Sequence, residues 1–160
     1  MSRFALLALV GLAASACAPG TGYRSSAAPV YPPAVFAHRV ATSDVEIYWN
    51  CSHPEPELLR VNGVVKNTGG REVRFLELQL VAVSAEERNI LKAATAVPDI
   101  VLHTNQVSPF QLDLRKSGRE ARYDLFYQYS IGVRLSTQNS QFMARDVCSE
   151  TQHRVSNMGG

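Results

Sequence analysis

The sequence lacks the charge pattern of a protein that binds nucleic acid. Its 16 lysines and arginines are balanced by 14 acidic residues, which leaves a formal net charge of +2, and the basic residues are scattered along the chain. A nucleic-acid-binding domain usually gathers such residues into a patch or stripe. With 46% hydrophobic and 19% charged residues, the chain has the composition of an ordinary globular domain, and we expect no nucleic-acid partner.

The motifs of the common enzyme classes are absent as well. The sequence has no Gly-x-Ser-x-Gly, no glycine-rich phosphate loop and no zinc motif with paired histidines. Its histidines stand far apart, at His38, His53, His103 and His153. A metal site could be formed by four residues close in sequence, Cys51, His53, Glu55 and Glu57, but a cysteine in a disulfide cannot bind a metal. We therefore expect no catalytic residues, no cofactor and no metal, and an enzyme with an unrecognised site is a minor alternative.

A long apolar run is missing, but the N-terminus carries a shorter one. One positive charge, at Arg3, precedes an apolar run from Phe4, and small residues stand before Cys17. This pattern is typical of a secretory signal peptide, because a helix needs roughly 20 apolar residues to span a bilayer. Residues 1–16 are therefore predicted to be a signal peptide, and the rest of the chain to be exported.

The residues before Cys17 fit two kinds of processing. Ala-Ser-Ala at 14–16 matches the small-x-small site of an ordinary signal peptidase, whereas the same residues followed by Cys17 resemble a bacterial lipobox, whose cysteine receives diacylglycerol. The chain has three cysteines, an odd number for an oxidising compartment. Lipidation of Cys17 would leave Cys51 and Cys148 as a disulfide pair. We favour this arrangement, and two unrelated buried thiols are the alternative.

The segments that flank the folded domain differ from it in composition. Residues 17–43 contain four prolines and little apolar periodicity, which predicts a lipid-anchored flexible linker that holds the domain away from the membrane. The prolines at 29–33 could alternatively form a recognition peptide for a proline-binding module. Residues 150–160 are predicted to be a polar C-terminal tail, which leaves residues 44–149 for the domain.

Two alternating runs organise the predicted fold. In residues 59–66 and 73–82, β-branched and aliphatic residues alternate with polar ones, and Asn-Thr-Gly-Gly stands between them at 67–70. This pattern predicts a β-hairpin with one buried face. The residues expected on that face include Leu59, Val61, Val65, Leu76, Leu78 and Leu80.

Further runs predict short strands before and after this pair. They lie at residues 45–51, 100–103, 109–115, 122–131 and 142–148, with 90–97 as a weak edge strand or an irregular segment. Residues 52–57 contain Pro54 and Pro56 and are predicted to be a loop. Seven or eight short strands with turns between them and no convincing helix predict an all-β fold, an antiparallel β-sandwich.

Three stretches resemble the FxLYD-like domains of bacterial envelope lipoproteins. They are Val-Asn-Gly-Val-Val-Lys-Asn-Thr-Gly at 61–69, the run at 75–83, and Ser-Pro-Phe-Gln-Leu-Asp-Leu at 108–114. The resemblance implies an immunoglobulin-like β-sandwich that serves as a non-enzymatic extracytoplasmic module. Ala18 follows the lipobox cysteine where inner-membrane lipoproteins usually carry aspartate, so the resemblance also implies an outer-membrane lipoprotein that faces the periplasm.

One predicted strand is rich in aromatic residues. Tyr123, Tyr127 and Tyr129 share one face of the run at 122–131, and Phe126 lies on the other. Because tyrosine is enriched in binding surfaces, these four residues are a candidate binding surface. Core packing, with a tyrosine hydroxyl that satisfies a loop, is the alternative and the interpretation we favour. The sequence thus predicts an exported, lipid-anchored binding or envelope-assembly accessory protein with an envelope protein as partner, or else a purely structural envelope lipoprotein.

Overall fold

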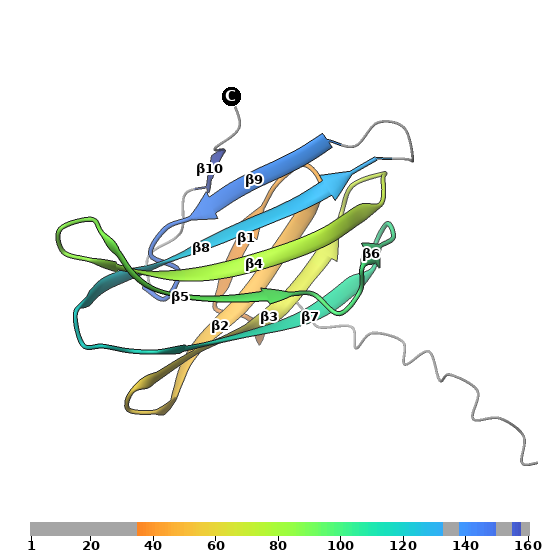
Figure 1. The fold of residues 1–160 in the computed structure, drawn as a ribbon. Helices are drawn as coiled ribbons and strands as arrows, with labels where there is room; N and C mark the ends of the chain where they lie inside the picture. Colours follow the sequence, from red (N-terminus) through yellow and green to blue (C-terminus); the bar gives the residue numbers. More distant parts are fainter. Residues whose placement is uncertain (1–34, 133–137, 150–154, 158–160) are drawn as a thin grey trace, which may run out of the picture.

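The computed structural model describes residues 35–132, 138–149 and 155–157, and these ranges hold ten β-strands and no α-helix (Figure 1). The strands are β1 (His38–Ala41), β2 (Val45–Glu55), β3 (Leu58–Asn67), β4 (Val73–Ser84), β5 (Asn89–Ala96), β6 (Val101–Leu102), β7 (Val107–Arg115), β8 (Glu120–Ile131), β9 (Gln138–Ala144) and β10 (Val155–Asn157). None of the described segments is a helix with the length and apolarity needed to cross a membrane. The predicted signal peptide, Cys17 and the linker up to residue 34 lie outside the described residues.

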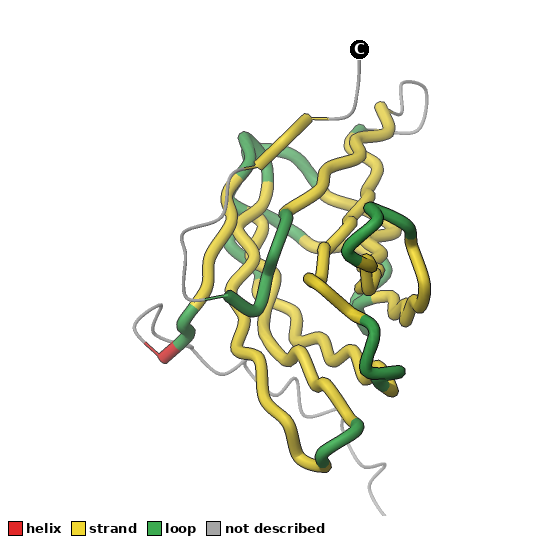
Figure 2. Tube along the Cα trace, turned by 90° about the vertical axis from the view of Figure 1, so that its left-hand side faces the viewer, coloured by secondary structure: helices red, strands yellow, loops and turns green. Residues whose placement is uncertain are grey.

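The strands form two antiparallel sheets that face each other (Figures 1 and 2). Sheet A has the order β1-β2-β3-β7, and sheet B has the order β10-β9-β8-β4-β5, with β6 paired to part of β4. In the letter names of immunoglobulin domains, β2, β3 and β7 take the places A, B and E, while β9, β8, β4 and β5 take G, F, C and C′. The predicted all-β, immunoglobulin-like sandwich is confirmed.

The core lies between the two sheets and follows from the alternation along each strand. Polar residues such as Glu77 and Gln111 point outward, and the apolar residues between them point inward. The residues that the alternation places on the inner faces of β3, β4 and β7 are buried: Leu59, Val61, Val65, Leu76, Leu78, Leu80, Phe110, Leu112 and Leu114. Burial of each such side chain stabilises the fold by about 1.5–3 kcal/mol, so the alternation explains why the sheets close on each other.

The predicted hairpin between β3 and β4 is wrong. β3 pairs with β2 and β7 in sheet A, whereas β4 pairs with β5 and β8 in sheet B, so residues 68–72 cross from one sheet to the other. The alternation does specify which face of each strand is buried, but it does not specify whether two such faces lie side by side or opposite each other. In this fold they lie opposite each other, across the core.

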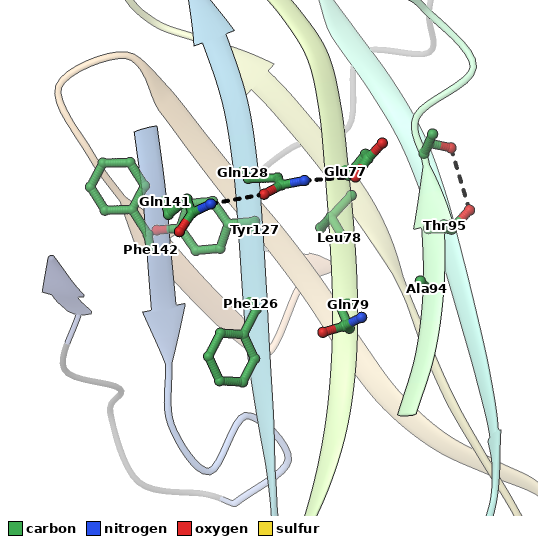
Figure 3. A pocket seen from close by; sticks show the side chains of 11 residues that line it. Glu77, Leu78, Gln79, Ala94, Thr95, Phe126, Tyr127, Gln128, Gln141 and Phe142 are labelled. Carbon is green, nitrogen blue, oxygen red and sulfur yellow. Dashed lines mark hydrogen bonds between the residues drawn. The ribbon is translucent and has the colours of Figure 1, made fainter. Parts of the chain in front are cut away.

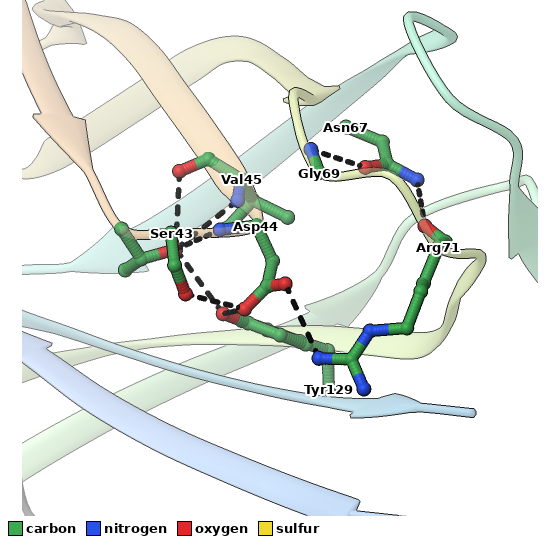
Figure 4. A network of polar contacts seen from close by, with 8 residues as sticks. Ser43, Asp44, Val45, Asn67, Gly69, Arg71 and Tyr129 are labelled. Carbon is green, nitrogen blue, oxygen red and sulfur yellow. Dashed lines mark hydrogen bonds and ion pairs between the residues drawn. The ribbon is translucent and has the colours of Figure 1, made fainter.

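A buried asparagine stabilises the crossover between the sheets. Asn67, at the end of β3, is fully buried, and its Nδ2 donates hydrogen bonds of 2.8 Å to the carbonyl oxygen of Arg71 (Figure 4) and to that of Leu102. Its Oδ1 accepts a hydrogen bond of 3.0 Å from the backbone N–H of Gly69. Every polar group of this buried side chain therefore has a backbone partner in the crossover or on β6, which favours the crossover over a hairpin turn.

Several predicted boundaries shift at the N-terminal edge of sheet A. The last part of the predicted linker forms β1, which pairs with β2 and places His38 opposite Trp49. The predicted loop at 52–57 is largely strand, because β2 continues to Glu55. Pro54 falls where the β2–β3 register shifts, and such an irregularity accommodates a residue that has no N–H.

The C-terminal boundaries shift as well. β9 begins at Gln138 and ends at Ala144, earlier than the predicted strand at 142–148, and the predicted polar tail contributes β10. Gln138 and Asn139 are exposed near the end of sheet B. Because both side chains are polar, this part of the sequence shows no alternation of apolar and polar residues, and a strand could not be predicted there.

The predicted disulfide between Cys51 and Cys148 is present, with a Cα–Cα distance of 5.6 Å. It connects β2 of sheet A to the segment after β9 of sheet B, and so it joins the two sheets at one end of the sandwich. Next to it, the fully buried Trp49 donates a hydrogen bond of 2.8 Å from Nε1 to the carbonyl oxygen of Val147. The bridge and the tryptophan together hold the segment after β9 against the core.

Candidate functional site

The outer face of sheet B carries a hollow of about 540 Å³, which we call the sheet B hollow (Figure 3). Outward-facing residues of neighbouring strands line it in two rows, as the strand register requires. The first row consists of Ala96, Glu77, Gln128 and Gln141. The second row consists of Ala94, Gln79 and Phe126. Phe126 is half-buried, so part of its ring faces solvent on this side of the sheet.

The first row is a chain of hydrogen bonds across three strands. Gln128 Nε2 donates to Glu77 Oε2 at 2.8 Å, and Gln141 Nε2 donates to Gln128 Oε1 at 3.1 Å (Figure 3). All three side chains are exposed. Each amide has two donors and an acceptor with two lone pairs, so hydrogen-bonding capacity remains for a ligand. The row therefore offers fixed donors and acceptors beside the apolar ring of Phe126.

The structure separates the four aromatic residues of the candidate binding surface. Phe126 points outward into the sheet B hollow, whereas the inward-facing Tyr127 and Tyr129 are each only 2% exposed. Their rings stack on Phe142 at centroid distances of 5.4 and 5.7 Å. The prediction of a binding surface is therefore wrong for these two tyrosines, and the core alternative is confirmed. Tyr123, near the start of β8, is half-buried.

The sequence did contain a signal for this separation. Leu125 and Ile131 have the same parity as the tyrosines of β8, and both are buried. A face that carries two large aliphatic residues as well as tyrosines is more consistent with a core face than with a surface. Only the residue of opposite parity, Phe126, could then have been assigned to the outside.

The hydroxyl of Tyr129 stabilises the turn between β1 and β2. It lies 3.1 Å from Thr42 Oγ1 and donates a longer bond of 3.5 Å to Asp44 Oδ2 (Figure 4). Arg71, from the crossover between β3 and β4, lies 3.9 Å from the same aspartate. Burial raises the pKa of Tyr129 to about 12, so its hydroxyl is neutral at physiological pH. This is the loop-satisfying role considered in the sequence analysis.

The remaining tyrosines of β8 are also kept neutral. Burial raises the pKa of Tyr123 and that of Tyr127. The Tyr127 hydroxyl has no hydrogen-bond partner within the described part of the chain. Neither side chain therefore offers a charged group for acid–base chemistry at neutral pH.

Three of the four histidines, His38, His53 and His103, lie in the described ranges, and they are not grouped into a metal site there. Within the described ranges, no three histidine, cysteine, aspartate or glutamate side chains are grouped so that they could hold a metal ion. Of the four residues of the metal site considered above, Cys51 is in the disulfide, and the side chains of His53, Glu55 and Glu57 are exposed.

Comparisons with known proteins give no family for the chain. No family model and no curated protein matches it. Among solved structures, it is similar to a yeast GGA1 GAE domain, with a TM-score of 0.49 and 12% identity over 68% of this chain and 97% of that one. The GAE domain of GGA2p from Saccharomyces cerevisiae gives a TM-score of 0.45 and 11% identity, over 76% of this chain and 97% of that one. Because both TM-scores are below 0.5, these similarities do not indicate a function. The assignment of the fold depends on the strand order described above.

Proposed function

We propose that this protein is an exported, non-enzymatic binding or envelope-assembly accessory protein, anchored by lipid at Cys17, and that it binds an envelope protein through the sheet B hollow. The observation that carries the proposal is the hollow itself. It combines a partly exposed aromatic ring, Phe126, with a row of exposed amide and carboxylate groups. Binding sites typically place a few polar groups around an apolar surface in this way.

The path of the chain into the domain supports this use of sheet B. Residues 35–37 lie over the outer face of sheet A, where Asn50 Oδ1 accepts a hydrogen bond of 2.7 Å from the Ala37 N–H and Asn50 Nδ2 donates one of 3.0 Å to the Val35 carbonyl. Phe36 packs near Tyr48 on the same face. A tether from Cys17 would therefore reach the domain on sheet A, and the outer face of sheet B would be free to meet a partner.

The resemblance to FxLYD-like envelope lipoproteins completes the proposal. It supports an outer-membrane lipoprotein that faces the periplasm, as expected from Ala18 after the lipobox cysteine. A purely structural role without a discrete partner is the competing function. Of the two experiments that follow, the first tests the lipid anchor and the second separates binding from a structural role.

The lipid anchor predicts the chemical form of the N-terminus. In membrane-extracted protein, intact-mass and peptide analysis is expected to find a chain that starts at Cys17 and carries diacylglycerol and an amide-linked acyl chain. More than one acyl chain is needed for durable attachment, so a Cys17→Ser variant should move to the soluble fraction. A mature chain that starts at Cys17 with no added lipid mass would contradict the anchor.

The sheet B hollow predicts which aromatic side chain matters for binding. In-cell crosslinking of the tagged, membrane-anchored protein is expected to capture one dominant envelope protein, and Phe126→Ala should reduce this capture about tenfold, because a central aromatic contact typically contributes more than 1 kcal/mol to an interface. Arg60→Ala is the control, since Arg60 lies on the outer face of sheet A, where it pairs with Asp113 of β7, and it does not line the sheet B hollow. Equal capture by both variants, or capture of abundant envelope proteins alone, would favour the structural role.

A further inference from the structure

Phe75 is exposed although it lies within a strand of sheet B. It is one of three large hydrophobic side chains that are exposed in the described ranges, and 64% of its surface faces solvent. Its backbone φ is +52°, in the left-handed region that bulky residues rarely adopt. The other non-glycine residues with positive φ in these ranges are Glu87, Asn105 and Asp146, and they lie in turns or bends. Strain of this kind clusters at functional sites, which makes Phe75 a candidate functional residue.

A β-bulge in β4 produces this exposure. The register of β4 with β8 shifts between Arg74 and Glu77, because β4 has one residue more than β8 in this interval. The extra residue lets Leu76 point into the core while Phe75 points to the outer face of sheet B. The Phe75 N–H donates a hydrogen bond of 3.0 Å to the carbonyl oxygen of Ile100, which stabilises the bulge. The ring is therefore directed to solvent by a specific local structure.

Phe75 borders a smaller hollow of about 240 Å³, which we call the bulge hollow. The row of Glu77, Gln128 and Gln141 lines both this hollow and the sheet B hollow, so the two meet at the row. Phe126 lies on one side of the row (Figure 3), and the strand register places Phe75 on the other side. With about 3.4 Å per residue, the two phenylalanines are separated by roughly 13 Å along the strands.

The row between the two rings carries a single charge. Of the residues that line the two hollows, Glu77 is the only one that is charged at neutral pH. Its Oε2 accepts the hydrogen bond from Gln128, and within the described part of the chain no basic side chain forms an ion pair with it. Arg74, on the same strand, pairs with Glu72 instead. A carboxylate favours a cationic ligand group, and the face of a phenylalanine ring attracts one as well.

We infer that Phe75, Glu77 and Phe126 together select a segment of the partner protein in which a basic residue stands between two apolar ones. This inference rests on the proposed binding function and specifies the chemistry of the partner. In an extended segment, side chains on one face repeat about every 6.8 Å, so residues i−2, i and i+2 would meet the first ring, the carboxylate and the second ring. The amides of Gln128 and Gln141 would bond to the backbone of the segment. A single amine headgroup of a lipid would meet Glu77 without reaching both rings.

The test selects peptides on the full mature chain from a random phage-displayed library and measures their affinity for three variants. The peptides are expected to share a lysine or arginine with apolar residues two places before and after it. Glu77→Gln keeps the acceptor for Gln128 but removes the charge, and it should weaken binding about tenfold. Phe75→Asn should have a similar effect without lowering the unfolding temperature, because asparagine tolerates positive φ better than phenylalanine. Phe75→Tyr keeps an aromatic ring and should bind like the parent chain.

Four other outcomes would each overturn the inference. The library may yield no peptide, or peptides that share no basic residue. Their affinity may be unchanged in Glu77→Gln or in Phe75→Asn. A Phe75→Asn chain that unfolds at a clearly lower temperature would show that the ring stabilises the bulge and not a ligand. A photo-crosslinker in place of Phe75 that captures in cells a second copy of the chain, or lipid alone, would assign the surface to another occupant.

The proposed function has a separate test. If in-cell capture of the partner is lost in Phe126→Ala but unchanged in Phe75→Asn and Glu77→Gln, the binding function stands and the inferred selection of a basic segment is wrong. If the membrane-anchored parent chain captures no dominant partner, the binding function itself is wrong.

Discussion

Replacement of both Cys51 and Cys148 by alanine is expected to lower the free energy of unfolding by about 4–5 kcal/mol in the chain-entropy model. The two cysteines are 97 residues apart in sequence, so the bridge removes a large closed loop from the freedom of the unfolded chain. Because a domain of this size is usually stable by only about 5–15 kcal/mol, this loss is a large part of the total. The double variant should therefore unfold at a markedly lower denaturant concentration than the chain with the bridge.

Denaturant unfolding of the lipid-free Cys17→Ser chain measures this effect. That chain serves as the parent, and a reducing agent should bring it close to the double variant. Thiol labelling of the parent under denaturing but non-reducing conditions should find no reactive cysteine. Two reactive thiols in that experiment, or equal unfolding midpoints for the parent and the double variant, would show that the bridge does not form or does not stabilise the domain.

The disulfide is also the tertiary contact that sequence arithmetic predicted best. Once Cys17 is assigned to lipid, Cys51 and Cys148 form the one remaining pair, and no geometry is needed to name it. The environment of the bridge could not be predicted in the same way. The hydrogen bond from Trp49 to the Val147 carbonyl depends on how sheet A packs against sheet B, and no local pattern encodes that packing.

The fold was predictable to the extent that it depends on alternation within single strands. The inward faces of β3, β4 and β7 follow directly from residue parity. The pairing of strands does not, and the hairpin prediction failed for this reason. The side chain of Asn67 bonds to the carbonyl of Leu102, which is 35 residues away, and a bond of that kind cannot be inferred from the turn sequence alone.

The same limit applies to the candidate site. Residue parity separated Phe126 from the tyrosines of β8, and in the structure Phe126 borders the hollow on the outer face of sheet B. The row of Glu77, Gln128 and Gln141 was not predicted, because it forms only when β8 lies between β4 and β9. Each of these residues alone is an ordinary polar residue on the solvent face of a strand. The site therefore arises from strand order, and a single sequence does not give that order.

The second large effect is expected for Gly63→Ala, which should destabilise the domain by about 3–5 kcal/mol. Gly63 lies in the middle of β3, between Trp49 on β2 and Phe110 on β7. A Cβ atom built on it would lie 1.9 Å from the backbone oxygen of Tyr48 and 2.9 Å from the Cα of Trp49. Both of these atoms belong to the backbone, so no side-chain rotation can relieve the contacts. The strands would have to separate and would lose ladder hydrogen bonds.

Gly70→Ala is the matched control for this prediction. Gly70 lies in the crossover after β3, and a Cβ atom there would meet nothing within 4 Å. Its substitution should change stability by less than about 1 kcal/mol, and loss of chain entropy in the unfolded state could even make it slightly stabilising. Thermal unfolding of the two variants in the lipid-free chain compares them directly. If Gly63→Ala unfolds within a few degrees of Gly70→Ala, the close approach of β2 and β3 at Gly63 is not a feature of the folded protein, and the packing of Trp49 described above would need revision.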